Sequence, residues 1–87
     1  MEREQVVEAL LTYLRTTFLQ GDERAELDER TPLLEWGILT SMNTAILLTH
    51  IREEFGTPVP PDRINATHFR DTGSIADLVL ELAPAGR

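Results

Sequence analysis

The chain has 87 residues and contains no cysteine, so it can form neither a disulfide framework nor a thiolate metal site. Its fold must therefore depend on apolar packing alone. Only two histidines occur, His50 and His68, and neither belongs to an H-E-x-x-H motif. A glycine-rich phosphate-binding loop is also missing. The sequence thus predicts no metal site and no nucleotide site of these kinds.

Long apolar segments are missing as well. No run approaches the roughly 18 apolar residues that a membrane-spanning helix needs. The start of the chain, Met1-Glu2-Arg3-Glu4, lacks the basic and then apolar pattern of a secretory signal. The sequence therefore predicts a protein that stays in the cytoplasm and does not bind membranes.

Basic residues are scarce, with 8 Lys and Arg against 15 Asp and Glu, for a formal net charge of −7. This charge repels phosphate backbones and anionic lipid, and it favours docking on basic patches of other proteins. Nucleic acid is excluded as a partner on this ground. An acidic surface also serves solubility alone, so a docking role and a purely solubilising role both stay open.

Apolar residues recur at helical spacing, which predicts an all-α fold with helices at about 2–19, 41–55, 61–66 and 73–82. Gly21 is the expected stop of the first helix, Gly56 and Pro58 that of the second, and Pro84 and Gly86 that of the last. The length leaves room for a single small domain, residues 1–87. Three predicted helices turn an apolar stripe inward. The stripes are Val7, Leu10, Leu11, Leu14 and Phe18; Thr44, Leu47, Leu48, Ile51 and Phe55; and Ile75, Leu78, Val79 and Leu82.

A connection of about 20 residues, 20–39, separates the first two predicted helices and is longer than most loops of a compact domain. Apolar side chains are expected to anchor it across the helices, with its acidic half, 22–30, in solvent. The anchors are Leu27, Leu33, Leu34, Trp36, Ile38 and Leu39. Apolar neighbours on both sides favour a loop-pinning role for Trp36, although the indole could instead contact a partner.

Ser41 is the candidate functional residue. It follows a glycine-containing turn and begins the segment that runs to Phe55, with Thr40 as the expected helix cap. A hydroxyl in the first turn of a helix lies where backbone N–H groups and the positive end of the helix dipole favour a phosphate. Such a serine suits a phosphodiester-linked prosthetic group. The alternative is that Ser41 is only a helix cap.

The second predicted helix has a further apolar face, formed by Met42, Ala45, Ile46 and Thr49, beside Ser41. One face can be buried in a small core, and the other would then be exposed and available to partner enzymes. Methionine side chains adapt to several partners. The alternative is a central helix that is buried on all sides.

The residues around Ser41 resemble the acyl and peptidyl carrier protein family, whose motif reads glycine, two apolar residues, aspartate, serine and an apolar residue. The match is Gly37-Ile38-Leu39-Thr40-Ser41-Met42, and it continues in Glu53-Glu54-Phe55-Gly56, Val59-Pro60 and the segment from Phe69 to Val79. The resemblance thus covers nearly the whole chain. One position departs from the family, because Thr40 stands in place of the aspartate that is thought to help the modifying transferase.

The resemblance implies a four-helix bundle with a long loop after the first helix, and covalent attachment of 4′-phosphopantetheine to Ser41. Trp36, Leu39, Thr40, Met42, Ala45, Ile46 and Thr49 are then expected to contact partners. The expected partners are a phosphopantetheinyl transferase, an adenylating or acyltransferase loading enzyme, and downstream acyl-transferring enzymes. Ile46 stands where a glutamate is common, which favours apolar docking. The departure at Thr40 leaves open which transferase recognises the chain.

The predicted function is that of a stand-alone, monomeric carrier and not of an enzyme. It would hold an acyl or aminoacyl group as a thioester for a polyketide or nonribosomal-peptide type of pathway, and an aminoacyl cargo is favoured. The alternative is an unmodified helical interaction scaffold. A serine-dependent enzyme is a third hypothesis, but His50 lies nine positions along the helix from Ser41, which is too far for a nucleophile and its base.

Overall fold

The computed structural model describes residues 2–19 and 27–83. Within these ranges the chain forms three α-helices and one short 3₁₀ helix, and no strand. The elements are α1 (Arg3–Thr17), α2 (Ser41–Phe55), η1 (Pro61–Arg63) and α3 (Thr72–Leu82). The all-α class is confirmed. The predicted bundle of four helices is not, because the third expected helix is a single 3₁₀ turn.

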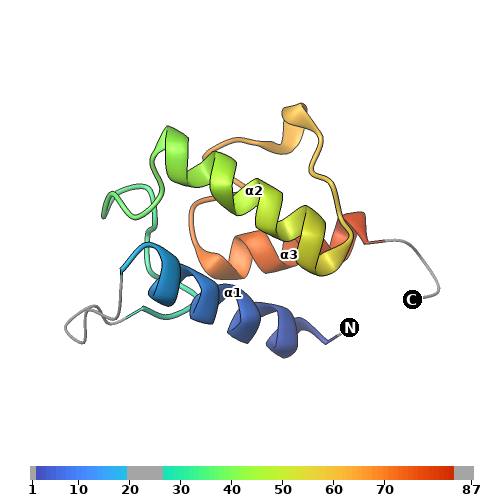
Figure 1. Ribbon diagram of the computed structural model, residues 1–87, viewed down its shortest axis with the longest axis horizontal. Helices are drawn as coiled ribbons and strands as arrows, with labels where there is room; N and C mark the ends of the chain where they lie inside the picture. Colours follow the sequence, from blue (N-terminus) through green and yellow to red (C-terminus); the bar gives the residue numbers. More distant parts are fainter. Residues whose placement is uncertain (1, 20–26, 84–87) are drawn as a thin grey trace.

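The short third element has a local cause. Pro61 fixes the first helical position, which proline tolerates well, but Ile64 leaves the helical region with φ −89° and ψ 85°. The turn therefore spans three residues where 61–66 was expected. The chain then runs as an irregular segment to Asp71, and this segment arches over one side of α2 in Figure 1.

Local signals determine the ends of α2, which begins and ends at the predicted residues. Thr40 caps its start, and Gly56 follows its end in the left-handed conformation, with φ 62°. Glycine adopts this conformation without the steric penalty of a Cβ atom. The first helix ends at Thr17, two residues before the predicted end, and Gly21, Pro84 and Gly86 lie outside the described residues.

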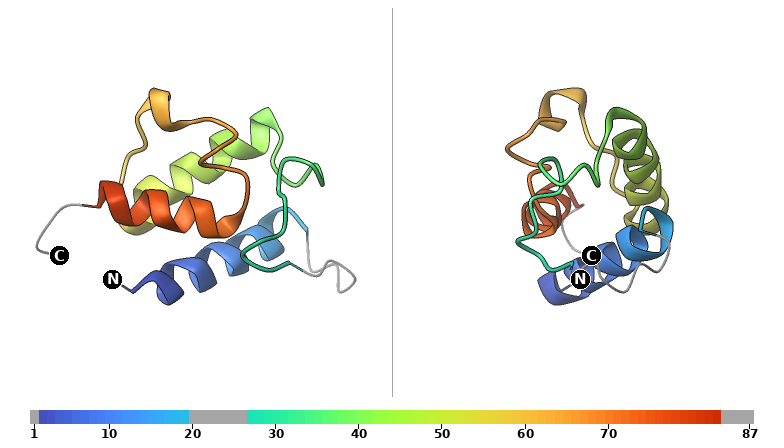
Figure 2. Two further views of the ribbon diagram at one scale, coloured as in Figure 1. Left: turned by 180° about the vertical axis from the view of Figure 1, so that it is seen from behind. Right: turned by 90° about the vertical axis from the view of Figure 1, so that its left-hand side faces the viewer.

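The core lies between the helices, with α1 packed closely along α3 (Figure 1). In the right-hand view of Figure 2, α2 and α3 lie on opposite sides with α1 below them, so the three helices enclose the apolar centre. Each contributes side chains that are almost fully shielded from water. Those with the largest volumes include Leu10 and Leu14 of α1, Leu47 and Ile51 of α2, and Ile75, Leu78 and Val79 of α3. All residues of the predicted inward stripes except Thr44 belong to this one core or pack against it.

The described part of the first connection, 27–40, is anchored as a structured loop. Leu27, Leu33, Ile38 and Leu39 are buried, as predicted. The backbone N–H of Leu33 donates to the Arg70 carbonyl at 2.8 Å, which ties the loop to the segment before α3. Residues 22–26 of the expected acidic half lie outside the described residues.

Two expected anchors are not buried, since Leu34 is 40% exposed and Trp36 is 59% exposed. The loop-pinning interpretation of Trp36 is therefore wrong. The backbone turn explains the outcome: the N–H of Trp36 donates to the Pro32 carbonyl at 3.0 Å, and Gly37 has φ 72°. This tight turn directs Leu33 and Ile38 inward and leaves the side chains at its tip outside.

No helix among the described residues is long and apolar enough to cross a membrane.

Candidate functional site

The start of α2 is held by a capping interaction. The Thr40 hydroxyl accepts a hydrogen bond from the backbone N–H of Asn43 at 3.2 Å, and the Thr40 carbonyl accepts from the N–H of Thr44 at 2.8 Å. Thr40 has an extended backbone, as residues at this position commonly do. Ser41 is thereby the first helical residue.

The loop before α2 fixes the helix start in space. The side-chain amide of Asn43 donates to the Ile38 carbonyl at 2.9 Å, and the N–H groups of Ile38 and Leu39 both donate to the Leu33 carbonyl, at 3.0 and 3.1 Å. Ile38 and Leu39 are buried directly before the exposed Thr40 and Ser41. The chain thus emerges from the core at the residue that carries the candidate hydroxyl.

Ser41 itself is exposed, and within the described residues its hydroxyl makes no hydrogen bond. The first turn of α2 contains no acidic residue, so no carboxylate compensates the positive end of its dipole. The start of α3 differs, because the Asp71 carboxylate there accepts from the N–H of Ser74 at 2.8 Å. Of the two serines in the chain, Ser41 is therefore the exposed one, and it begins the helix whose start carries no negative charge.

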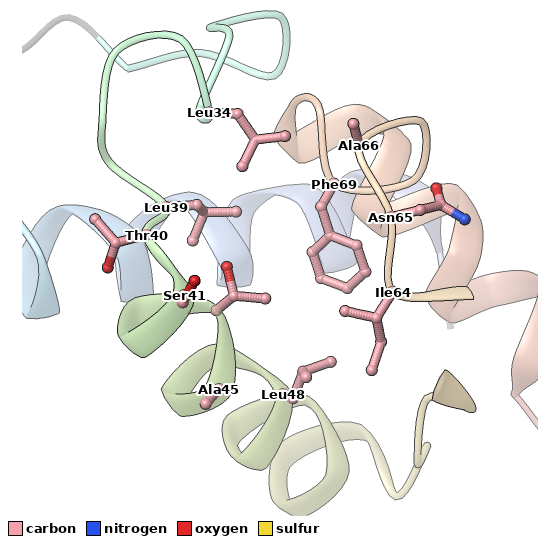
Figure 3. A pocket seen from close by; sticks show the side chains of 11 residues that line it. Leu34, Leu39, Thr40, Ser41, Ala45, Leu48, Ile64, Asn65, Ala66 and Phe69 are labelled. Atoms are coloured by element: carbon pink, nitrogen blue, oxygen red, sulfur yellow. The ribbon is translucent and has the colours of Figure 1, made fainter. Parts of the chain in front are cut away.

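A cleft of about 490 Å³ opens beside Ser41, between α2 and the segment that follows η1. In Figure 3, Leu48 of α2 lies opposite Ile64 and Phe69, and Leu34 and Leu39 approach from the loop. Its lining consists of Leu34, Leu39, Thr40, Ser41, Thr44, Ala45, Leu48, Ile64, Asn65, Ala66 and Phe69. None of these side chains carries a charge, so the cleft suits an uncharged, mainly apolar group.

Exposed apolar side chains flank the cleft and the serine. Met42 is 73% exposed and Ile46 is 41% exposed, while Leu47 and Ile51 on the other side of α2 are fully buried. Ala45 and Thr49 are exposed as well. The second apolar face of α2 is thus confirmed, and the alternative of a helix buried on all sides is wrong. We call Trp36, Met42 and Ile46 the apolar ridge.

One expected partner contact does not reach the surface. Leu39 is 3% exposed and lines the cleft from inside, because the turn before α2 directs its side chain toward the core. A partner cannot touch Leu39 while the loop keeps this conformation. Thr40, Met42, Ala45, Ile46 and Thr49 remain accessible.

The model of one protein family, described as the phosphopantetheine attachment site (PP-binding), matches residues 5–79. This match extends from α1 to α3 and includes every residue of the cleft and the apolar ridge. The chain belongs to the PP-binding family. Its cofactor is covalently bound 4′-phosphopantetheine.

A solved structure described as the crystal structure of an FAD-dependent dehydrogenase contains a chain that is similar to this PP-binding domain. The two are 37% identical with a TM-score of 0.77, and the match covers 82% of this chain and 99% of that one. No curated protein matches this chain.

The histidines lie apart from the serine. The ring of His50 stacks on Tyr13, with 3.6 Å between centroids and 8° between planes, so it faces α1. The backbone N–H of His68 donates to the side-chain oxygen of Asn65 at 3.0 Å. The described residues contain no group of three or more side chains that could hold a metal ion.

The sequence pointed to Ser41 and the ridge but not to the far wall of the cleft. Ile64, Ala66 and Phe69 come from an irregular segment more than 20 residues away, and only its path over α2 brings them to the serine. The one local signal in the sequence was Ile64, an apolar residue between Arg63 and Asn65. In the structure its side chain is 37% exposed.

Proposed function

We propose that this PP-binding domain is a carrier in which Ser41 bears the 4′-phosphopantetheine arm. The observation that carries the proposal is the free, exposed hydroxyl at the first position of α2, inside the matched family region. A phosphodiester there gains from the unpaired N–H groups and from the helix dipole. The arm supplies a terminal thiol, which holds the cargo as a thioester.

The residues around Ser41 fit such a group. Thr40 caps the helix through a neutral hydroxyl, so no neighbouring carboxylate repels the phosphate. The arm leaves the serine at the edge of the apolar cleft, where Ala45, Leu48 and Ile64 offer uncharged surface to the arm and its cargo. The protein supplies position, while the cofactor supplies the reactive group.

Carrier domains work with a phosphopantetheinyl transferase and with the enzymes of a pathway. We propose a polyketide or nonribosomal-peptide type of pathway here, with an acyl or aminoacyl cargo. The apolar ridge is the proposed contact surface for its enzymes, because Met42 directly follows the serine, Trp36 lies in the loop before it, and both are exposed outside the core. Each contact should be weak, since one surface serves several partners in turn.

The similarity to a chain in a structure described as an FAD-dependent dehydrogenase supports one further partner. The cleft beside Ser41 has no basic side chain to balance the pyrophosphate of FAD. We therefore propose that an enzyme of this kind oxidises the carried group, and that this chain presents the group without binding the flavin itself.

The test is the intact mass of the protein after incubation with coenzyme A and a broad-specificity phosphopantetheinyl transferase. We expect the wild type and Ser74→Ala to gain one phosphopantetheine, and Ser41→Ala to gain none. Ser74 is a matched control because it also lies in the first turn of a helix and is the other serine of the chain. If no protein gains mass with several transferases, the carrier proposal fails and an unmodified interaction scaffold, with the ridge as its contact surface, takes its place.

A further inference from the structure

A second hollow, of about 440 Å³, lies between α1 and α2 and has no part in the attachment site. We call it the α1–α2 notch. Its lining consists of Glu8, Ala9, Thr12, Tyr13 and Thr16 of α1 with His50 and Glu54 of α2. These positions share one face of each helix, because spacings of three and four residues bring side chains to the same side.

The notch combines an aromatic surface with negative charge. Tyr13 and His50 are half-buried and stacked on one another, and Phe18 and Phe55 meet the stack edge to face, with centroid separations of 5.9 and 6.4 Å. Glu8 and Glu54 are exposed at its edges. Neither carboxylate forms an ion pair with any residue that the structure describes, and no lysine or arginine lines the notch.

A planar cation complements this arrangement best. A guanidinium group stacks on aromatic rings and presents a fork of N–H donors to carboxylates, whereas an ammonium is a compact, strongly hydrated charge. The net charge of −7 attracts a cation of either kind, but the stacked rings select the flat one. We infer that the α1–α2 notch receives an arginine side chain of a partner protein.

The notch is continuous with the proposed contact surface. Met42, Ile46, His50 and Glu54 follow one another at intervals of four residues, so they form one row along α2. Nine residues of helix separate Ser41 from His50, which corresponds to about 13 Å along the axis. A small protein interface of about 600 to 800 Å² on each side is wide enough to cover both ends of this row.

This continuity gives the notch a distinct role in docking. The apolar ridge beside Ser41 carries no charge, and apolar contact is non-directional, so it holds a partner without fixing its rotation about the serine. A charged contact at the other end of the row fixes the orientation of the partner relative to α2. The inference concerns the partner of the proposed carrier, but the notch and its charges do not depend on modification of Ser41.

The experiment is a titration of the ¹⁵N-labelled protein with N-acetyl-arginine methylamide, and separately with N-acetyl-lysine methylamide, at low salt. We expect saturable chemical-shift changes confined to 8–16 and 50–54, with the arginine probe binding about fivefold more tightly than the lysine probe. The double variant Glu8→Gln/Glu54→Gln should weaken arginine binding at least tenfold. The control Glu4→Gln/Glu53→Gln removes the same charge from exposed sites on the same helices. This control should change the affinity for the arginine probe little.

Three outcomes overturn the inference: shift changes spread over all acidic surfaces, equal affinity for both probes, or equal losses in both double variants. His50→Leu provides a second check, because it removes the ring but keeps both carboxylates, and it should abolish the preference for arginine. Thermal unfolding confirms that each variant is folded. Ser41→Ala should bind the arginine probe like the wild type, so failure of phosphopantetheine attachment and failure of the notch give different results.

Discussion

At the scale of single residues, Thr40 and Ser41 divide the work at the start of α2. Thr40 is uncharged and caps the helix with its hydroxyl, so the hydroxyl of Ser41 is not needed as a cap. The family's acidic residue would cap equally well and would add a negative charge. In this chain, the residue before the serine caps the helix but adds no negative charge.

Replacement of Thr40 tests this division. Thr40→Ala removes the capping oxygen and should lower the free energy of unfolding by about 1 kcal/mol, whereas Thr40→Asp should keep it or raise it slightly. Urea denaturation measures both changes. A loss in Thr40→Asp as large as that in Thr40→Ala would contradict the capping role. The rate of phosphopantetheine loading, measured on the same variants, separates capping from recognition, because only Thr40→Asp restores the charge of the family motif.

At the scale of elements, α2 has one face in the core and another in solvent. Leu47 is fully buried and its neighbour Ile46 is 41% exposed, although both are large aliphatic residues of the same helix. The sequence predicted two apolar faces, and the packing of α1, α3 and the 64–69 segment decides which one is covered.

This asymmetry predicts losses of stability of very different size for substitutions at neighbouring positions. Leu47→Ala should lower the free energy of unfolding by about 2 to 5 kcal/mol, because it leaves a cavity in the core. Ile46→Ala should lower it by about 0.5 kcal/mol or less, since little buried surface is lost. Chemical denaturation measures both. The same Ile46→Ala protein, loaded with phosphopantetheine, should show a raised KM with an enzyme that acts on its cargo; an unchanged KM would remove Ile46 from the docking surface.

At the scale of the whole molecule, ionic contacts join segments that are far apart in the chain. The Arg3 guanidinium contacts Asp77 of α3 at 2.8 Å and Glu29 of the loop at 2.9 Å. The N–H of Gly73 also donates to the Glu29 carbonyl at 2.9 Å. Asp77 and then Glu29 hold the pKa of Arg3 above its ordinary value. The start of α1, the loop and α3 are thus tied together at one end of the core.

Arg3→Gln should therefore lower the melting temperature at low salt, and the difference should shrink at high salt, because these side chains are partly exposed and screened. A raised pKa means that the contribution of Arg3 is fully present below the pKa of arginine in the unfolded chain, and is lost only as the pH rises through the higher folded value. Titration of Arg3 itself should then produce no pH dependence between about pH 5 and pH 9. A melting difference that is independent of salt would contradict an ionic origin.

The sequence alone determined the features that depend on neighbouring residues. Periodic apolar positions indicated α1, α2 and α3, Thr40 and Gly56 marked both ends of α2, and Ser41 stood out at its start. These signals act through local hydrogen bonds, the dipole of one helix and the allowed backbone conformations, all of which a short stretch of sequence contains.

Only the tertiary structure decided the features that need contacts between distant segments. The cleft exists because the 64–69 segment lies across from α2. The notch exists because the ring of Tyr13 on α1 stacks on that of His50 on α2. Trp36 is exposed because it lies at the tip of the turn between Pro32 and Gly37. The sequence gives the apolar character of such residues but not the direction in which each side chain points. That direction follows from how the helices share one small core, which leaves some apolar side chains beside Ser41 for partners instead of packing.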